Sequence, residues 1–198
     1  VKLPADFSQL RQRSQQGEMA KETNKERVSM ELCRSLVGGK PVAGSRPPID
    51  KHYPATGEVI ARIEPADETV LDQAVAVAAE AQREWAARSR AERSVILQAA
   101  ADGLRARNDE LSRLEVMDVG KCYGEAVSAD VPSGADAMAF FASMAMTETG
   151  DMHRFGDAIA YCERVPLGVC AGIGAWNYPV QIACWKAAPA LAAGNAFI

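Results

Sequence analysis

The chain has 198 residues, of which 48% are hydrophobic and 24% are charged, and its formal net charge is −4. This composition predicts a globular protein large enough to bury a core, and it excludes the strongly basic surface with which proteins bind nucleic acid. No apolar run approaches the roughly 18 residues that would span a bilayer, and the first thirty residues lack the apolar core of a secretory signal. We therefore expect a cytoplasmic protein with no nucleic-acid partner and no membrane partner.

The cysteines and histidines do not form a recognisable metal or disulfide pattern. They are Cys33, Cys122, Cys162, Cys170, Cys184, His52 and His153. An odd number of cysteines without a C-x-x-C pair argues against a zinc site, and reduced thiols are typical of cytosolic proteins. A nucleophilic thiol is the alternative, but no cysteine follows a helix start or a nearby histidine that would lower its pKa.

The N-terminal part combines a polar arm with short strands. Residues 1–35 are predicted to be a polar arm without regular structure, because few aliphatic residues interrupt the Gln, Ser, Lys and Glu. Leu36–Val42 is predicted to be a hairpin turned by a Gly pair. A second strand pair is predicted at Ile49–Tyr53 and Val59–Ile63, joined by a Pro-Ala-Thr-Gly turn.

Three helices are predicted next. Asp67 is placed to cap a helix whose apolar residues recur every three to four positions as far as Trp85. The Ser-Arg-Ala-Glu segment that starts at Ser89 is a capping box that opens a second helix. Asn108 is predicted to cap a third helix, which ends where Gly120 follows Val119.

A fourth helix is predicted from Glu125 to about Met146, with Pro132 early in it or just before it. Its apolar stripe predicts four residues that face the core, Ala137, Phe140, Phe141 and Met144. Residues 150–156 are then predicted to be a loop, and residues 158–165 an extended strand.

The last 33 residues carry the most informative pattern. An apolar run at Gly168–Ile173 is followed by a loop, an Ala-rich helical segment and a second apolar run at Ala196–Ile198. This order of strand, loop, helix and strand is the unit that builds a parallel α/β sheet. Because the chain stops on the second strand and starts at Val1 rather than Met, we expect a fragment of a longer protein.

Five short motifs resemble the aldehyde dehydrogenase superfamily in order and spacing. They are Tyr-Pro-Ala-Thr-Gly-Glu at 53–58, Asp-Val-Gly-Lys at 118–121, Gly-Ile-Gly-Ala-Trp-Asn-Tyr-Pro at 172–179, Trp-Lys at 185–186 and Pro-Ala-Leu-Ala-Ala-Gly-Asn at 189–195. The similarity covers about Leu36 to Ile198, and the segment that includes residues 171–183 resembles betaine aldehyde and 4-trimethylaminobutyraldehyde dehydrogenases in particular.

The resemblance implies a fold and an activity. Residues 36–198 would be the N-terminal part of an α/β, Rossmann-like cofactor-binding domain, incomplete here, with β-hairpin arms, oligomerisation strands and a helical segment. The complete protein would be a homo-oligomer that oxidises a small-molecule aldehyde to the carboxylate with NAD or NADP. A trimethylammonium aldehyde such as betaine aldehyde is the implied substrate.

The resemblance also implies roles around the Trp-Asn-Tyr-Pro motif. Asn177 would donate its side-chain amide to the oxyanion of the reaction, whereas the residue type alone also fits a helix cap. The cofactor contacts would be Ile173, Gly174, Ala175, Trp176 and Asn177. They follow the carboxyl end of the first strand of the cofactor-binding domain, where open α/β sheets bind ligands. Trp176 as a plain core aromatic is the alternative.

The resemblance also implies roles in substrate binding, charge relay and cation binding for four further residues. Tyr178 and Trp185 are seven residues apart, so on a helix they would share one face. Two rings on one face could hold a quaternary ammonium by cation–π attraction. Packing of both rings in the core is the alternative. Lys186 matches a lysine with a charge-relay role in bacterial betaine aldehyde enzymes, and a solvated or interface lysine is the alternative. Asp118 matches the region of a monovalent-cation (K⁺) site bound largely by backbone carbonyls.

The family's nucleophilic Cys and general-base Glu lie in a later domain, so we expect this segment alone to be inactive. Cys184 is not that nucleophile, because it lies within a predicted helix and in a different motif.

Two alternatives to a dehydrogenase for trimethylammonium aldehydes remain. One is a truncated, non-catalytic product that acts as a subunit-assembly module through its hairpin and the 158–165 strand. The other is an aldehyde dehydrogenase for a different substrate class, such as semialdehydes or general aliphatic aldehydes.

Overall fold

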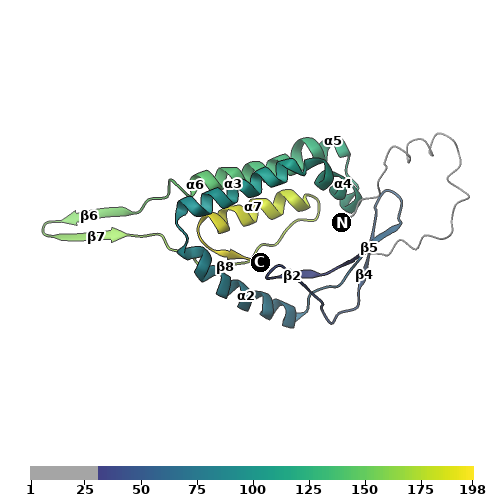
Figure 1. The fold of residues 1–198 in the computed structure, drawn as a ribbon, viewed down its shortest axis with the longest axis horizontal. Coiled ribbons are helices and arrows are strands. Elements are labelled where there is room, and N and C mark those ends of the chain that lie inside the picture. Colours follow the sequence, from purple (N-terminus) through teal and green to yellow (C-terminus); the bar gives the residue numbers. More distant parts are fainter. Residues whose placement is uncertain (1–30) are drawn as a thin grey trace, which may run out of the picture. The chain divides into compact units, whose positions relative to one another are not determined.

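The computed structural model describes residues 31–198, and its elements follow one another as in Figure 1. The first thirty residues of the predicted polar arm lie outside the described residues. The arm was predicted to extend to residue 35, but Glu31–Cys33 form strand β1, which pairs in parallel with β5 (Val59–Ile63). A strand of three residues has too few positions to show a periodic pattern, so the sequence did not reveal it.

The predicted strand pairs are confirmed. Strands β2 (Ser35–Val37) and β3 (Lys40–Val42) form an antiparallel hairpin, and β4 (Ile49–His52) pairs antiparallel with β5. The β2–β3 turn consists of Gly38 and Gly39, whose φ angles are 57° and 75°. Glycine adopts this left-handed backbone without a steric cost, which explains why the Gly pair turns the chain here.

The helical part begins with α2 (Glu68–Ala87), α3 (Arg90–Ala106) and α4 (Asn108–Val119). Asp67 accepts a hydrogen bond from the Val70 amide at 3.0 Å, and both bonds of the capping box at Ser89 are present, so these two predictions are confirmed. The prediction for Asn108 is wrong, because Asn108 is the first residue of α4 and its amide donates to the Val127 carbonyl at 2.9 Å.

The fourth helix is interrupted. It consists of α5 (Tyr123–Glu125), a π-helical turn η1 (Ala126–Asp130) and α6 (Val131–Met144). Phe140 and Met144 were predicted to face the core, but 58% and 47% of their surfaces are exposed, whereas Phe141 does pack against the core. The buried face carries Ala135, Met138 and Ala142 instead. Small residues let helices approach closely, so packing selected this face over the one with the largest side chains.

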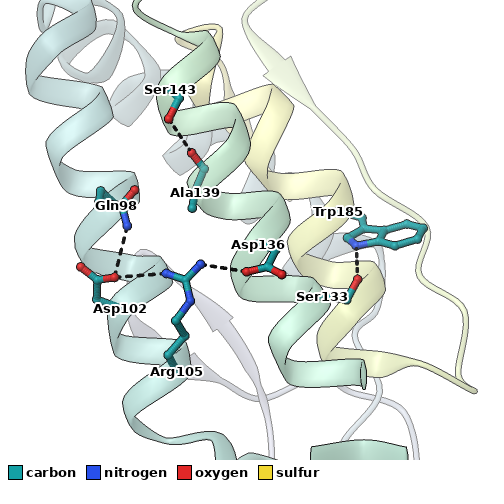
Figure 2. Close-up of polar contacts among 8 residues, drawn as sticks. All are labelled: Gln98, Asp102, Arg105, Ser133, Asp136, Ala139, Ser143 and Trp185. Atoms are coloured by element: carbon teal, nitrogen blue, oxygen red, sulfur yellow. Dashed lines mark hydrogen bonds and ion pairs between the residues drawn. The ribbon is translucent and has the colours of Figure 1, made fainter. Parts of the chain in front are cut away.

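Helices α3, α6 and α7 (Pro179–Ala192) lie side by side (Figure 1) and enclose the main hydrophobic core. Its buried members are Leu97, Ala101, Met138, Ala142, Ala145, Cys184, Ala188 and Ala192. At one end of these helices, Arg105 of α3 pairs with Asp136 of α6 at 2.9 Å (Figure 2). The core therefore fixes α7 as a rigid element, and the residues before α7 are positioned by its first turn.

Residues 151–162 form a hairpin of β6 (Asp151–Phe155) and β7 (Ala158–Cys162). The predicted loop at residues 150–156 is therefore mostly strand, and the predicted strand at 158–165 ends at Cys162. Every residue of both strands is exposed, so no burial alternation marked β6 in the sequence.

The strand, loop, helix and strand predicted at the C-terminal end are confirmed. Strand β8 (Val169–Cys170) pairs in parallel with β9 (Ala196–Phe197), and α7 lies between them in sequence. The strand is shorter than the predicted run at Gly168–Ile173. This crossover unit confirms the α/β fold class and places the Trp-Asn-Tyr-Pro motif in the loop that follows β8.

Candidate functional site

The loop between β8 and α7 is open to solvent. Ile173 and Trp176 expose 90% and 86% of their surfaces. Gly174 has open space around it, since a Cβ there would meet only Ile182 Cγ2 at 4.0 Å. Gly172 has a different role, because a Cβ there would lie 2.2 Å from the ring of Phe197. Residues 173–176 thus present accessible backbone and apolar side chains after the carboxyl end of a parallel strand, which fits a nucleotide cofactor.

Asn177 does not cap α7. The N-cap position is occupied by Tyr178, without a side-chain hydrogen bond, and Pro179 begins the helix. Among residues 31–198, no hydrogen bond holds the Asn177 side chain. Asn177 instead lines a cavity of about 450 Å³. The other lining residues are Lys51, Pro54, Asp118, Val119, Lys121, Glu125, Trp176 and Tyr178.

Charged residues surround the ring of Tyr178 in this cavity. The Nζ of Lys121 lies 3.8 Å from the ring centroid, and the Tyr178 hydroxyl donates to Glu125 Oε1 at 3.2 Å. Lys121 also forms an ion pair with Asp130, whose side chain is completely buried. Tyr178 is therefore held from its ring face and from its hydroxyl.

Glu115 of α4 contacts the first turn of α7: it is 2% exposed, and its Oε1 accepts a hydrogen bond from the Val180 amide at 3.2 Å. Burial raises the pKa of Glu115, the Val180 amide opposes this shift, and the charge of Asp130 adds to it. Neither Glu115 nor Asp130 was among the residues predicted for the site. A signal existed for Glu115, because it falls four residues after Leu111 on the apolar side of the helix.

The Asp118 side chain takes part in an ion pair at the cavity. Its carboxylate pairs with Lys51 Nζ at 2.8 Å, so a lysine already neutralises it. Within residues 31–198, no group of three or more His, Cys, Asp or Glu side chains is arranged to hold a metal ion. The K⁺ site therefore stays a prediction that depends on backbone carbonyls.

Tyr178 and Trp185 do not share a helix face, contrary to the expectation from their spacing. Tyr178 lies outside the helix, with φ −140° and ψ 63°. Trp185 is 48% exposed and donates its indole N–H to Ser133 Oγ of α6 at 3.2 Å (Figure 2). Trp185 and Lys186 are not among the residues that line the Asn177 cavity, and Lys186 is exposed on α7.

Cys184 is 7% exposed, and burial raises the pKa of its thiol, with the charge of Glu115 adding to the shift. A buried thiol with a raised pKa carries little thiolate, which agrees with the expectation that Cys184 is not a nucleophile.

Among the described helices, none combines the length and apolar character needed to cross a bilayer.

Comparison with known proteins identifies the family. Residues 42–198 match the Aldehyde dehydrogenase family. The chain is 52% identical over 166 residues to a betaine aldehyde dehydrogenase of Cereibacter sphaeroides, which covers 82% of this chain and 34% of the relative. It is 54% identical over 152 residues to a betaine aldehyde dehydrogenase of Agrobacterium fabrum, which covers 76% of this chain and 31% of the relative.

The fold comparison agrees. The chain resembles PnpE from Pseudomonas sp. WBC-3 with a TM-score of 0.81 and 33% identity, over 84% of this chain and 34% of PnpE. PnpE in complex with nicotinamide adenine dinucleotide matches with a TM-score of 0.80 and 34% identity, over 83% of this chain and 34% of that chain. The chain spans about one third of the length of the relatives it matches. The sequence match over most of its length shows that this chain belongs to the aldehyde dehydrogenase family.

Proposed function

We propose that the chain is the N-terminal part of a dehydrogenase that oxidises a trimethylammonium aldehyde, such as betaine aldehyde, to its carboxylate with NAD or NADP. Family membership and the betaine aldehyde dehydrogenases among its relatives support this proposal. The nucleophilic cysteine and the general-base glutamate would come from a later part of the protein, so the segment alone would be inactive.

The observation that carries the proposal is the position of Asn177. Asn177 lines the cavity, its side chain has no hydrogen bond within residues 31–198, and a neighbouring residue takes the N-cap position. When a cysteine thiolate adds to an aldehyde carbonyl, negative charge develops on the carbonyl oxygen. An amide N–H from Asn177 would stabilise that oxyanion, and such a donor contributes about 2.7–4 kcal/mol to the transition state.

The cofactor would lie against residues 173–177. The exposed side chains of Ile173 and Trp176 and the open space at Gly174 support this placement, and Ala175 belongs to the same exposed loop. NAD or NADP, when bound, would supply the acceptor for the hydride that leaves the substrate carbon. The residues of this loop would bind and orient the cofactor while Asn177 faces the substrate.

The substrate ammonium would be held by the rings of Tyr178 and Trp185. A cation against an aromatic face gains roughly 0.5–2 kcal/mol. Tyr178 is the better supported of the two, because it lines the same cavity as Asn177. Lys186 as a charge relay and K⁺ near Asp118 complete the set of proposed roles.

The complete protein would be a cytoplasmic homo-oligomer. The exposed β6–β7 hairpin supports a role in subunit assembly, both in this homo-oligomer and in the alternative of a non-catalytic assembly module, because its ten exposed strand residues include Met152, Phe155, Ile159 and Tyr161. Exposed apolar side chains on an edge strand are suited to pairing with another chain.

Steady-state oxidation assays separate these alternatives. The complete protein is assayed for NADH and NADPH formation with betaine aldehyde and with a neutral aliphatic aldehyde of similar size. The proposal predicts reduction of the cofactor with a preference for betaine aldehyde. A preference for the neutral aldehyde would indicate another substrate class, and no reduction with either aldehyde would favour the assembly module.

A further inference from the structure

Two carboxyl groups, one bonded to the first turn of α7 and the other paired with the cavity residue Lys121, are more deeply buried than an acidic side chain normally is. Glu115 of α4 is 2% exposed, and Asp130, at the end of η1, is 0% exposed. Buried carboxylates are costly unless they are paired and hydrogen-bonded, so their presence calls for a function.

The first of them caps α7 from a different helix. Tyr178 provides no capping bond, and Pro179 has no N–H, so the Val180 amide is the first donor of the helix that needs an acceptor. Glu115 Oε1 accepts from it at 3.2 Å. Glu115 therefore acts as the N-terminal cap of α7, although it lies 65 residues before Val180 in the sequence.

The second carboxyl group acts on the adjoining residue of the loop. Asp130 pairs with Lys121, whose side chain is only 10% exposed, and Lys121 Nζ lies 3.8 Å from the Tyr178 ring centroid. Together with Glu115, this pair holds the chain at Tyr178 and at Val180. Asn177 directly precedes this doubly held segment.

The two carboxyls differ in how they are compensated. Asp130 pairs with the Lys121 ammonium, whereas burial raises the pKa of Glu115. Glu115 Oε2 and Asp130 Oδ1 are both buried, and neither has a hydrogen-bond partner within residues 31–198. Removing Lys121 alone would leave the buried Asp130 carboxyl without its partner, so a variant that tests this pair changes both residues together.

We propose that Glu115, Asp130 and Lys121 are positioning residues that fix the orientation of Asn177 by holding Tyr178 and Val180. This inference rests on the proposed function, which makes Asn177 the donor to the oxyanion. A donor must be aligned with the oxyanion to within a fraction of an ångström, so loosening these contacts slows the chemical step and leaves cofactor binding in place.

The test measures single-turnover hydride transfer and the dissociation constant for NAD⁺ in the complete dehydrogenase. Glu115→Leu removes the acceptor and is expected to slow hydride transfer by about ten-fold, with the NAD⁺ dissociation constant changed by less than about two-fold. Glu115→Gln keeps a side-chain oxygen that can accept from the Val180 amide, so its rate is expected to stay within about two-fold of the parent. Glu110→Gln is the control, because Glu110 lies on the same helix but is paired with Arg107 at the surface.

The same variants are made in an Asn177→Ala background. If Glu115 acts through Asn177, Glu115→Leu causes no further loss there. Should Glu115→Leu fail to fold, the double variant Lys121→Met with Asp130→Asn removes the ion pair without leaving an unpaired charge, and the same ten-fold loss and the same background dependence are expected from it.

Full rates in Glu115→Leu and in the Lys121/Asp130 double variant would overturn the inference. Equal slowing with and without Asn177 would overturn it too, because the effect would then be general. In both cases a slow Asn177→Ala enzyme leaves the proposed function intact. A fast Asn177→Ala enzyme would overturn the proposed function first, and the positioning role with it.

Discussion

The Lys121 ammonium lies 3.8 Å from the centroid of the Tyr178 ring, and both residues line the cavity that contains Asn177. One face of this ring is therefore already next to a positive charge. If the substrate carries an ammonium group, as proposed, Lys121 would repel it on that side, and it would bind the opposite face of the Tyr178 ring.

This arrangement leads to a prediction about substrate choice. Tyr178→Ala and Trp185→Ala in the complete enzyme are expected to reduce kcat/KM for trimethylammonium aldehydes two- to thirty-fold more than for neutral aldehydes of similar size, which corresponds to about 0.5–2 kcal/mol. Measuring both substrates on each variant decides the matter. A selective loss in Tyr178→Ala alone would reduce the cage to one ring, and equal losses for both substrates would show that the rings only pack.

The cap of α2 predicts a pH-dependent stability. Hydrogen bonds from the Ser45 hydroxyl, the Val70 amide and the Ser45 amide lower the pKa of Asp67 from 3.8 to about 2. A lowered pKa in the folded state gives stability that is present above pH 3.8 and is lost as the pH falls toward 2. Asp67→Ala is expected to lower Tm by about 2–4 °C at pH 7. Asp67→Asn, which keeps an acceptor oxygen, is the matched control.

Thermal unfolding of both variants between pH 7 and pH 2 is the measurement. The difference in Tm between the parent and Asp67→Asn should shrink as the pH falls below 4, because the parent carboxylate is then protonated. A constant difference over this range would show that the charge of Asp67 does not contribute.

Replacement of glycine by alanine is expected to have opposite effects on the free energy of unfolding at two positions. Gly120 ends α4 with φ 76°, and a Cβ there would lie 2.9 Å from Pro54 Cβ, so Gly120→Ala is expected to destabilise the protein by more than about 1 kcal/mol. Gly103 lies within α3 with nothing inside 4 Å of a built Cβ, so Gly103→Ala should stabilise it by about 0.5–1 kcal/mol. Denaturant unfolding of the two variants tests this, and a neutral Gly120→Ala would contradict the strain assigned to the turn.

The sequence predicted the features that depend on neighbouring residues. The cap at Asp67, the capping box at Ser89 and the glycine turn of β2–β3 each involve residues within three positions of one another. Local geometry determines these elements whatever packs against them, so pattern and residue type were sufficient.

Features set by tertiary contacts were not predictable in this way. The exposed faces of Phe140 and Met144 result from how closely α6 packs, and the Glu115–Val180 bond joins residues far apart in the chain. The importance of Asn177 came from the resemblance to a family, whereas its cavity is formed by Lys51, Pro54 and other distant residues. Single-sequence patterns do not encode such distances.

The central claim is that Asn177 stabilises the oxyanion, and stopped-flow measurement of NADH formation in a single turnover of Asn177→Ala tests it most directly. The account predicts that hydride transfer in the complete enzyme slows by roughly 10²–10³ while the dissociation constant for NAD⁺ changes little, as expected when an interaction made only in the transition state is lost. A variant that transfers hydride at nearly the parent rate would contradict the account.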